Sequence, residues 1–247
     1  MKNFQIIKEG AKKFWKNPIL GLPALLQLVI NYIPIILVSA AIALMAGVPI
    51  ISILFNPGSI SMDLLDKIIL WIIILFVILG FLLMIIYSFF EGMLIGMLKS
   101  GKRKLDFGSG VKFWSRIFRF YLLFGIYIVL TILIVGATAV LTKITVWLVI
   151  IPVIISLAFL ISIPLFLLGS YYIVINDLKV KEALKKSCKI VWKHYFKFLG
   201  LMLLLTIIAA LVVLILGWIP FAGVVLINVL SMTYIKICFY LFASSRD

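Results

Sequence analysis

The sequence predicts an all-α integral membrane protein, in which six transmembrane helices form three hairpins and a basic amphipathic helix precedes each hairpin. Three observations predict this fold class: an apolar composition, six long apolar runs, and a basic segment that recurs three times along the 247 residues. The chain is 66% hydrophobic and only 13% charged, with a mean hydropathy of +1.33. A single soluble core cannot hide that much apolar surface, so the composition excludes an ordinary soluble domain.

Six apolar runs are each long enough to cross a bilayer as a helix. A hydrocarbon core of about 30 Å needs about 20 residues, and a helix satisfies its own backbone hydrogen bonds in lipid. A cleaved signal peptide has only about 7 to 15 apolar residues, so we expect the first run to remain as a membrane helix. The runs cover residues 19–42, 68–90, 119–141, 145–168, 198–217 and 218–241.

The charged residues are distributed very unevenly about these runs. Of the 23 Lys and Arg residues, 21 fall in the N-terminal segment, the connections after the second and fourth runs, or the C-terminal end. Only Lys67 and Lys143 fall on the other side. Because cytoplasmic loops carry the excess of Lys and Arg, this pattern predicts a multi-pass protein of the cell membrane with both termini in the cytoplasm.

A basic segment rich in aromatic residues precedes the first, third and fifth runs, at residues 4–18, 111–123 and 181–200. We interpret the chain as one membrane domain, residues 1–247, of three repeat units, residues 1–98, 99–176 and 177–247. At about 100° per residue, the third segment places Leu184, Cys188 and Trp192 on one face and its lysines on another. The predicted N-caps of the three helices are Asn3, Asp106 or Ser109, and Asp177.

A basic helix with an apolar face that contains tryptophan, joined to a membrane span, is typical of helices that lie among lipid headgroups. Each Lys near an anionic membrane surface contributes about 1 kcal/mol of binding free energy. The segments therefore predict contacts with anionic membrane lipids or a membrane protein partner; the alternative is that they only set the topology. Nucleic acid is not an expected partner, because no reading motif accompanies the cations. The candidate headgroup contacts are Lys12, Lys13, Lys16, Lys112, Arg116, Arg119, Lys185, Lys186, Lys189, Lys193 and Lys197.

Polar residues inside the predicted spans form a second set of candidates. Glu91 falls near the cytoplasmic end of the second run, where we expect an interfacial carboxylate paired with a nearby Lys or Arg; the alternative is a buried proton or ion site. Gln27 and Asn31 lie one turn apart in the first run, and Asn228 lies in the sixth at a similar depth. Such residues most often hydrogen-bond between helices, and the alternative is a sparsely lined solute pathway.

No motif of a known reaction stands out. His194 is the only histidine, which excludes a histidine-based metal site or a Ser-His-Asp triad within one chain. The two cysteines, Cys188 and Cys238, indicate neither a disulfide framework nor a metal site, and no phosphate-binding Gly-Lys loop is present. We therefore expect no enzymatic activity and no cofactor.

The segment 171–205 contains the run Glu182-Ala183-Leu184-Lys185-Lys186-Ser187, which follows a short polar gap and leads into an aromatic-rich basic stretch. This pattern resembles one in multi-span prokaryotic proteins, namely the membrane domain that precedes some glycerophosphodiester phosphodiesterases and related six-span proteins of unknown function. The sequence lacks the soluble phosphodiesterase domain, so the resemblance implies a membrane architecture and no enzymatic activity.

These predictions favour a non-enzymatic accessory or scaffold protein that engages acidic lipid headgroups or a membrane partner at the cytoplasmic face. The alternative is a transporter or channel for a small or amphipathic solute, with a cavity among the three hairpins. A lipid-modifying enzyme ranks third, because no catalytic constellation supports it.

Overall fold

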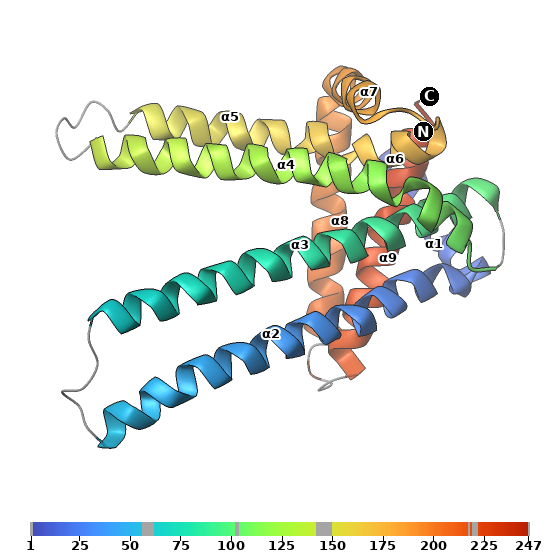
Figure 1. The fold of residues 1–247 in the computed structure, drawn as a ribbon. Coiled ribbons are helices and arrows are strands. Elements are labelled where there is room, and N and C mark those ends of the chain that lie inside the picture. Colours follow the sequence, from blue (N-terminus) through green and yellow to red (C-terminus); the bar gives the residue numbers. More distant parts are fainter. Residues whose placement is uncertain are drawn as a thin grey trace. The chain divides into compact units, whose positions relative to one another are not determined.

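The computed structural model describes residues 2–55, 62–101, 104–141, 150–216, 218 and 222–246. Every element within these ranges is a helix, which confirms the predicted all-α class for the described residues (Figure 1). The elements are α1 (Asn3–Lys16), the short 3-10 helix η1 (Pro18–Gly21), α2 (Leu22–Phe55), α3 (Met62–Ser100), α4 (Phe107–Leu141), α5 (Ile150–Leu167), α6 (Gly169–Ile175), α7 (Val180–Lys193), α8 (Tyr195–Leu216) and α9 (Ala222–Ser244).

Five helical stretches are long and apolar enough to cross a membrane: Pro18–Ala41, Ile69–Ser100, Phe107–Thr138, Ile150–Ile175 and Tyr195–Leu216. Large apolar side chains point outward from them, as at Val77 and Ile132, which are 66% and 63% exposed. Large contiguous apolar surfaces of this kind are rare on soluble proteins and are solvated by lipid in membrane proteins. The chain is therefore a multi-pass helical membrane protein. In α9 the apolar stretch Val229–Ser244 is shorter, so the sixth span stays a prediction.

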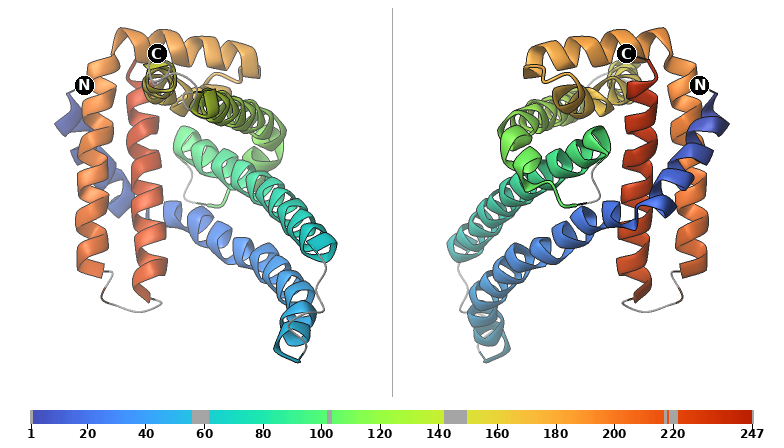
Figure 2. Two further views of the ribbon diagram at one scale, coloured as in Figure 1. Left: turned by 90° about the vertical axis from the view of Figure 1, so that its left-hand side faces the viewer. Right: turned by 90° about the vertical axis from the view of Figure 1, so that its right-hand side faces the viewer.

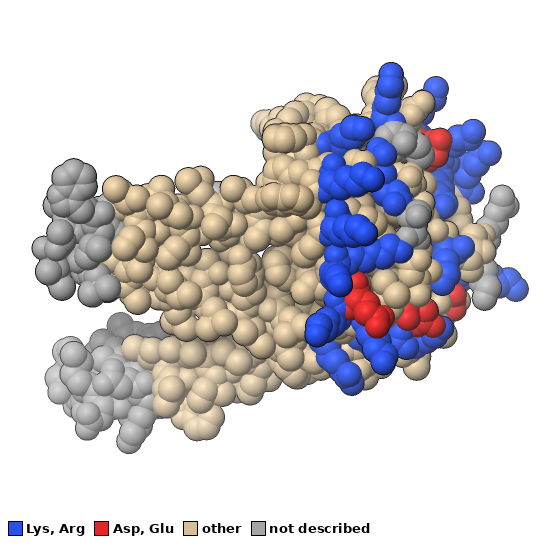
Figure 3. Space-filling view, turned by 90° about the horizontal axis from the view of Figure 1, so that it is seen from above, with Lys and Arg blue, Asp and Glu red and all other residues tan. Residues whose placement is uncertain are grey.

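The chain divides into two compact units, Met1–Leu25 with Ser88–Asp247 and, separately, Leu26–Tyr87. The second unit consists of the apolar parts of α2 and α3. The first unit holds every Lys and Arg whose side chain the structure describes, and Figure 3 shows these cations gathered on one part of the surface. Lys143 and the side chain of Lys67, both predicted for the opposite side of the membrane, lie outside the described residues.

The core of the first unit surrounds α6, in which Gly169 to Val174 are all buried. Helices α4, α5, α7 and α9 pack against it. A Cβ atom at position 169 would lie 2.2 Å from the ring of Phe120 in α4, so only glycine permits this close approach. Helices α8 and α9 run side by side (Figure 2), and the rings of Phe198 and Phe242 join them at 5.0 Å between centroids.

The first and third basic segments form the separate helices α1 and α7, but the second does not. Residues 111–123 lie inside α4, which continues unbroken from Phe107 to Leu141. Pro18 lacks an N–H and restricts Asn17 before it, so α1 ends at Lys16 with Asn17 as its C-cap. No proline or glycine lies within residues 111–123, but none lies within residues 181–199 either, where α7 ends at Lys193. The absence of these residues therefore does not by itself explain why α4 continues into the span. The pseudo-threefold repeat stays a prediction.

Helix α1 packs on α9 through a small-residue contact. Ile6 and Gly10 are buried there, and a Cβ atom at position 10 would lie 2.7 Å from Cys238 Sγ. The Tyr234 hydroxyl donates a hydrogen bond to the Ile7 carbonyl at 2.9 Å. Trp15 remains 76% exposed, so only part of the predicted apolar face of α1 is covered by protein.

The predicted N-caps have different outcomes. Asp106 is confirmed, because its carboxylate accepts a hydrogen bond from the Ser109 backbone N–H at 3.2 Å, just before α4 begins. Asn3 was wrong as a cap: it is the first residue of α1, and its side-chain amide donates to the Lys197 carbonyl at 2.8 Å. Asp177 was also wrong, because α7 begins after Lys179 and Asp177 makes the ion pairs described below.

Candidate functional site

Helix α7 packs against the protein in part through buried residues of the Glu182–Ser187 motif and the turn after it. Ala183, Ser187 and Val191 recur every fourth residue and are buried. The Ser187 hydroxyl donates a hydrogen bond to the Leu165 carbonyl, which lies in the last turn of α5, where helix carbonyls have no intrahelical partner. The motif therefore combines a small buried face that lets α7 approach α5 with lysines that stay outside.

A groove of about 530 Å³ follows another side of α7 and reaches the C-terminal end of α9. Four lysines of α7 and one arginine after α9 line it, against a single acidic residue, Glu182. We call it the cationic groove. Its lining residues are Leu178, Glu182, Lys185, Lys186, Lys189, Ile190, Lys193, His194 and Arg246.

Aromatic rings position two of these cations. The Lys186 ammonium lies 5.2 Å from the centre of the Tyr172 ring, and the Arg246 guanidinium lies 5.7 Å from that of Phe242. Cation–π contacts of this length attract the cation without neutralising its charge. The groove therefore keeps a strongly positive potential, which favours an anionic ligand.

His194 lies at the end of α7, where the chain turns into α8. Its pKa is lowered from the ordinary value of 6.5, first by partial burial and then by the positive charges of Arg246, Lys193 and Lys197. The imidazole is therefore neutral at pH 7, with one nitrogen that donates and one that accepts a hydrogen bond.

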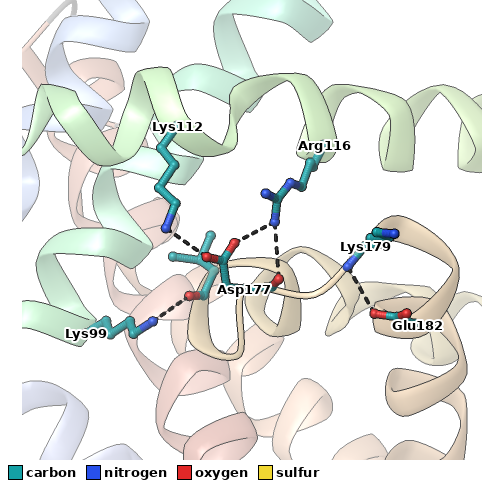
Figure 4. A network of polar contacts seen from close by, with 7 residues as sticks. Lys99, Lys112, Arg116, Asp177, Lys179 and Glu182 are labelled. Carbon is teal, nitrogen blue, oxygen red and sulfur yellow. Dashed lines mark hydrogen bonds and ion pairs between the residues drawn. The ribbon is translucent and has the colours of Figure 1, made fainter.

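Asp177 engages the cations at the start of α4 (Figure 4). Its carboxylate lies 2.8 Å from Lys112 Nζ and 2.5 Å from Arg116 Nη1, and Arg116 also donates to the Asp177 carbonyl at 3.2 Å. Asp177 has a φ of 55°, a left-handed conformation that aspartate tolerates better than most residues. Hydrogen bonds from Lys112 and then Arg116 hold the Asp177 pKa below its ordinary value. Two predicted headgroup contacts thus tie the α6–α7 connection to α4.

A further lysine, on α3, binds the end of α6 that leads into this connection. Lys99 Nζ donates a hydrogen bond to the Val174 carbonyl at 3.0 Å (Figure 4). Val174 lies in the last turn of α6, where a cation compensates both the unpaired carbonyls and the negative end of the helix dipole. The end of α6 is therefore held by cations from two other helices.

The remaining headgroup candidates differ in exposure. Lys13 is half-buried, with its ammonium 4.9 Å from the centre of the Tyr240 ring, and burial lowers its pKa although the charge of Glu9 opposes the shift. Four others are exposed at the surface: Lys12, Lys16, Arg119 and Lys197.

Glu91 is buried in the first unit, with only 1% of its surface exposed. One carboxylate oxygen accepts a hydrogen bond from the Tyr121 hydroxyl of α4 at 2.5 Å, and the other accepts one from the Ser170 hydroxyl of α6 at 2.6 Å. Lys236 of α9 is 7% exposed and interacts electrostatically with Glu91. Side chains from four helices therefore meet at one carboxylate that is buried in protein and interacts electrostatically with Lys236. Its expected position at the membrane interface stays a prediction.

The other intramembrane candidates are not brought to this cluster by any described contact. Gln27 and Asn31 lie one turn apart on α2, in the second unit. Asn31 Oδ1 is buried and has no hydrogen-bond partner among the described residues. Asn228 lies in α9, but its side chain is outside the described part of the chain, so its pairing with Asn31 stays a prediction.

Several residues of these sites were not among the sequence candidates. Lys236 interrupts an otherwise apolar stretch of α9, and that isolation was the available signal. Tyr121 and Ser170 could not be predicted as partners of Glu91 from the sequence, because they lie 30 and 79 residues away from it along the chain. Arg246 was counted only in the charge distribution, although it completes the cationic groove.

The described residues hold no group of three or more His, Cys, Asp or Glu side chains placed to bind a metal ion. No protein-family model matches the chain, and neither the curated proteins nor the solved structures include a match. The functional conclusion therefore depends on the geometry of the chain itself.

Proposed function

We propose that this protein is a non-enzymatic membrane protein that binds anionic lipid headgroups at the cytoplasmic face. The observation that carries the proposal is the cationic groove, in which five Lys and Arg side chains converge against one acidic residue. The helix that supplies four of them, α7, runs directly into the membrane-spanning stretch Tyr195–Leu216. A cationic surface at that position faces lipid headgroups.

The proposal includes a topology of six spans with both termini in the cytoplasm and α9 as the last span. The positive-inside distribution of Lys and Arg supports this orientation. Trp218, 85% exposed between α8 and α9, suits the opposite membrane interface, where tryptophan is enriched. The proposal keeps the threefold recurrence of a basic segment before a hairpin as a feature of the sequence, with the second of these segments inside α4.

The expected binding free energy is substantial but bounded. At about 1 kcal/mol for each cation near an anionic surface, the four lysines of the groove contribute up to about 4 kcal/mol. Salt screens exposed charges over about 8 Å at physiological ionic strength, so the measured contribution will be smaller. A loss of at least about 1.4 kcal/mol, which is a factor of ten in affinity, is the expected result of neutralising all four.

Native mass spectrometry of the protein released from mild detergent tests the proposal. We expect wild type to retain anionic phospholipid, and a variant with Lys185, Lys186, Lys189 and Lys193 all changed to Gln to lose it. The matched control changes Lys2, Lys8, Lys104 and Lys181 to Gln, which removes the same charge from exposed positions outside the groove. Equal retention by the two variants would overturn the proposal, and co-purification of a protein in place of lipid would favour the membrane-partner alternative.

A second candidate function is transport of a small or amphipathic solute, and the buried Glu91 and Lys236 favour it. Ionisable groups within membrane segments commonly mark proton or ion pathways. In this structure both Glu91 oxygens accept hydrogen bonds from protein hydroxyls, which favours a structural carboxylate. Solute flux into proteoliposomes that depends on Glu91 would support transport over lipid binding alone.

A further inference from the structure

A second groove adjoins the cationic groove at the corner between α7 and α8. It has a volume of about 700 Å³, and it shares Lys193 and His194 with the cationic groove. Its other lining residues are mostly apolar or aromatic: Ile161, Trp192, Tyr195, Phe196 and Lys197. The two grooves therefore meet at Lys193 and His194, and the lining is mainly cationic in the first groove and richer in apolar and aromatic residues in the second.

We infer that the two grooves form a single site for one anionic phospholipid molecule. Its phosphate lies among Lys189, Lys193 and Arg246, and one acyl chain crosses the corner beside Phe196 toward Ile161. This inference rests on the proposed function, and it adds which lipid part each groove binds and where on the chain the tail lies.

The apolar half of the site favours a lipid over a free phosphate ion. Trp192 and Phe196 are 68% and 85% exposed, a large apolar surface that a free phosphate would leave uncovered. Ile161 belongs to the membrane-spanning stretch Ile150–Ile175, so this half of the site opens toward hydrocarbon. An acyl chain in this half of the site contacts the exposed rings of Trp192 and Phe196 and stays continuous with the surrounding lipid.

The cationic half favours an anionic headgroup over a zwitterionic one. Phosphate oxygens can accept hydrogen bonds from lysine ammonium groups and from the arginine fork. The ammonium of a zwitterionic headgroup would meet five cations and only one carboxylate, that of Glu182. Such like-charge contacts disfavour it.

His194 lies where the two halves join. Its backbone N–H already donates to the Ile190 and Val191 carbonyls, each at 3.1 Å, so the side chain is the part that is available to a ligand. A neutral imidazole at this point can donate to a phosphate or glycerol oxygen. The corner therefore offers donors to the headgroup and an apolar wall to the chain next to it.

Photo-crosslinking tests the position of both lipid parts. The full-length protein in nanodiscs is exposed to an anionic phospholipid that carries a diazirine in one acyl chain, and crosslinked peptides are located by mass spectrometry. We expect crosslinks at Ile161 and in residues 192–197, and at least a tenfold lower yield when Lys193 and Arg246 are changed to Gln. The matched control, Lys104 and Lys181 changed to Gln, keeps the wild-type yield, as does addition of soluble glycerol phosphate or inorganic phosphate.

The outcomes separate this inference from the proposed function. Anionic lipid that is retained through the lysines but crosslinks elsewhere along the chain would overturn the single-site inference and leave the proposed function standing. Displacement of the lipid by inorganic phosphate at equal concentration would show a site for free phosphate and also overturn the inference. A crowding variant, Ile161→Trp, gives an independent check: it should reduce the crosslinks in residues 192–197 without reducing lipid retention, and unchanged crosslinks would count against the assigned tail position.

Discussion

The buried carboxylate of Glu91 should be among the most sensitive positions for the stability of the first unit. Replacing Glu91 with Leu removes both hydrogen bonds that the carboxylate accepts and leaves the Tyr121 and Ser170 hydroxyls without this acceptor. It also removes the negative charge that faces the buried Lys236. The buried Lys236 then loses the electrostatic attraction of the Glu91 carboxylate, and such a loss is costlier in a buried site than at the surface.

The expected cost follows from these losses. Removing one partner of a buried charge pair costs about 3 to 5 kcal/mol in soluble proteins. Hydrogen bonds within membrane proteins are weaker on average, at about 0.6 kcal/mol with a maximum near 1.7, because the unfolded chain in a membrane also finds partners. We therefore expect Glu91→Leu to lower the free energy of unfolding by about 3 kcal/mol, and Ser170→Ala or Tyr121→Phe to lower it by about 1 kcal/mol each.

Equilibrium unfolding in mixed detergent micelles measures these differences. The decisive variant is the double substitution Glu91→Leu with Lys236→Met, because replacing a buried charge pair with apolar residues of similar size is often nearly neutral. We expect the double variant to recover at least half of the loss caused by Glu91→Leu alone. A double variant that is as unstable as the sum of the two single variants would refute the argument that Glu91 compensates Lys236.

Three further predictions concern other contacts. Asp177→Asn should remove the two ion pairs and lower the free energy of unfolding by about 1 kcal/mol or less, since both pairs are partly exposed. Asparagine still tolerates the left-handed φ of this position. Because the Asp177 pKa is lowered in the folded state, the stabilisation by the ion pairs is complete above the ordinary pKa of 3.8 and is lost as the pH falls through the lowered pKa. Unfolding measured as a function of pH should therefore show a smaller acid destabilisation in Asp177→Asn than in wild type, and identical pH profiles would contradict the ion pairs. Gly10→Ala should weaken the packing of α1 on α9 and lower the melting temperature, because the new Cβ would lie 2.7 Å from Cys238 Sγ. Adding Cys238→Ala should recover part of that loss. Additive effects of the two changes on the melting temperature would show that the two positions are not in contact. In a background with Cys188 and Cys238 replaced by Ala, an impermeant maleimide added to intact cells should label Trp218→Cys and leave Lys181→Cys unlabelled, and the reverse pattern would invert the topology.

The helices and their membrane character could be predicted because both depend on local properties. Apolar runs of sufficient length specify a membrane helix wherever they occur, and Pro18 explains locally why α1 ends before the first span. The second basic segment shows the limit of this reasoning, since its composition matches the other two but it continues into α4. Composition indicates that a segment is basic and amphipathic, but it does not determine whether the segment ends before the span: α7 ends at Lys193 without a proline or glycine, whereas α4 continues.

The sites were harder to predict because their partners are distant in sequence. The helical projection placed Leu184, Cys188, Val191 and Trp192 on the apolar face of α7. Val191 is buried and Leu184 packs against the core, but Trp192 is 68% exposed, and the buried Ala183 and Ser187 were not on the predicted face. Small residues carry little hydrophobic signal, yet they permit the closest helix approach. Likewise, the sequence indicated that Glu91 would have a cationic neighbour, but the Tyr121 and Ser170 hydroxyls are brought to it by tertiary packing alone.

The affinity of the purified protein for anionic relative to zwitterionic phospholipid tests the central claim most directly. Binding of short-chain lipids that share the same acyl chains, measured by calorimetry at low and at physiological salt, isolates the contribution of the headgroup. The cationic groove predicts at least tenfold tighter binding of the anionic lipid at low salt, a smaller preference at physiological salt, and loss of the preference when its four lysines are changed to Gln. Equal affinity for the two lipids at both salt concentrations would contradict the account.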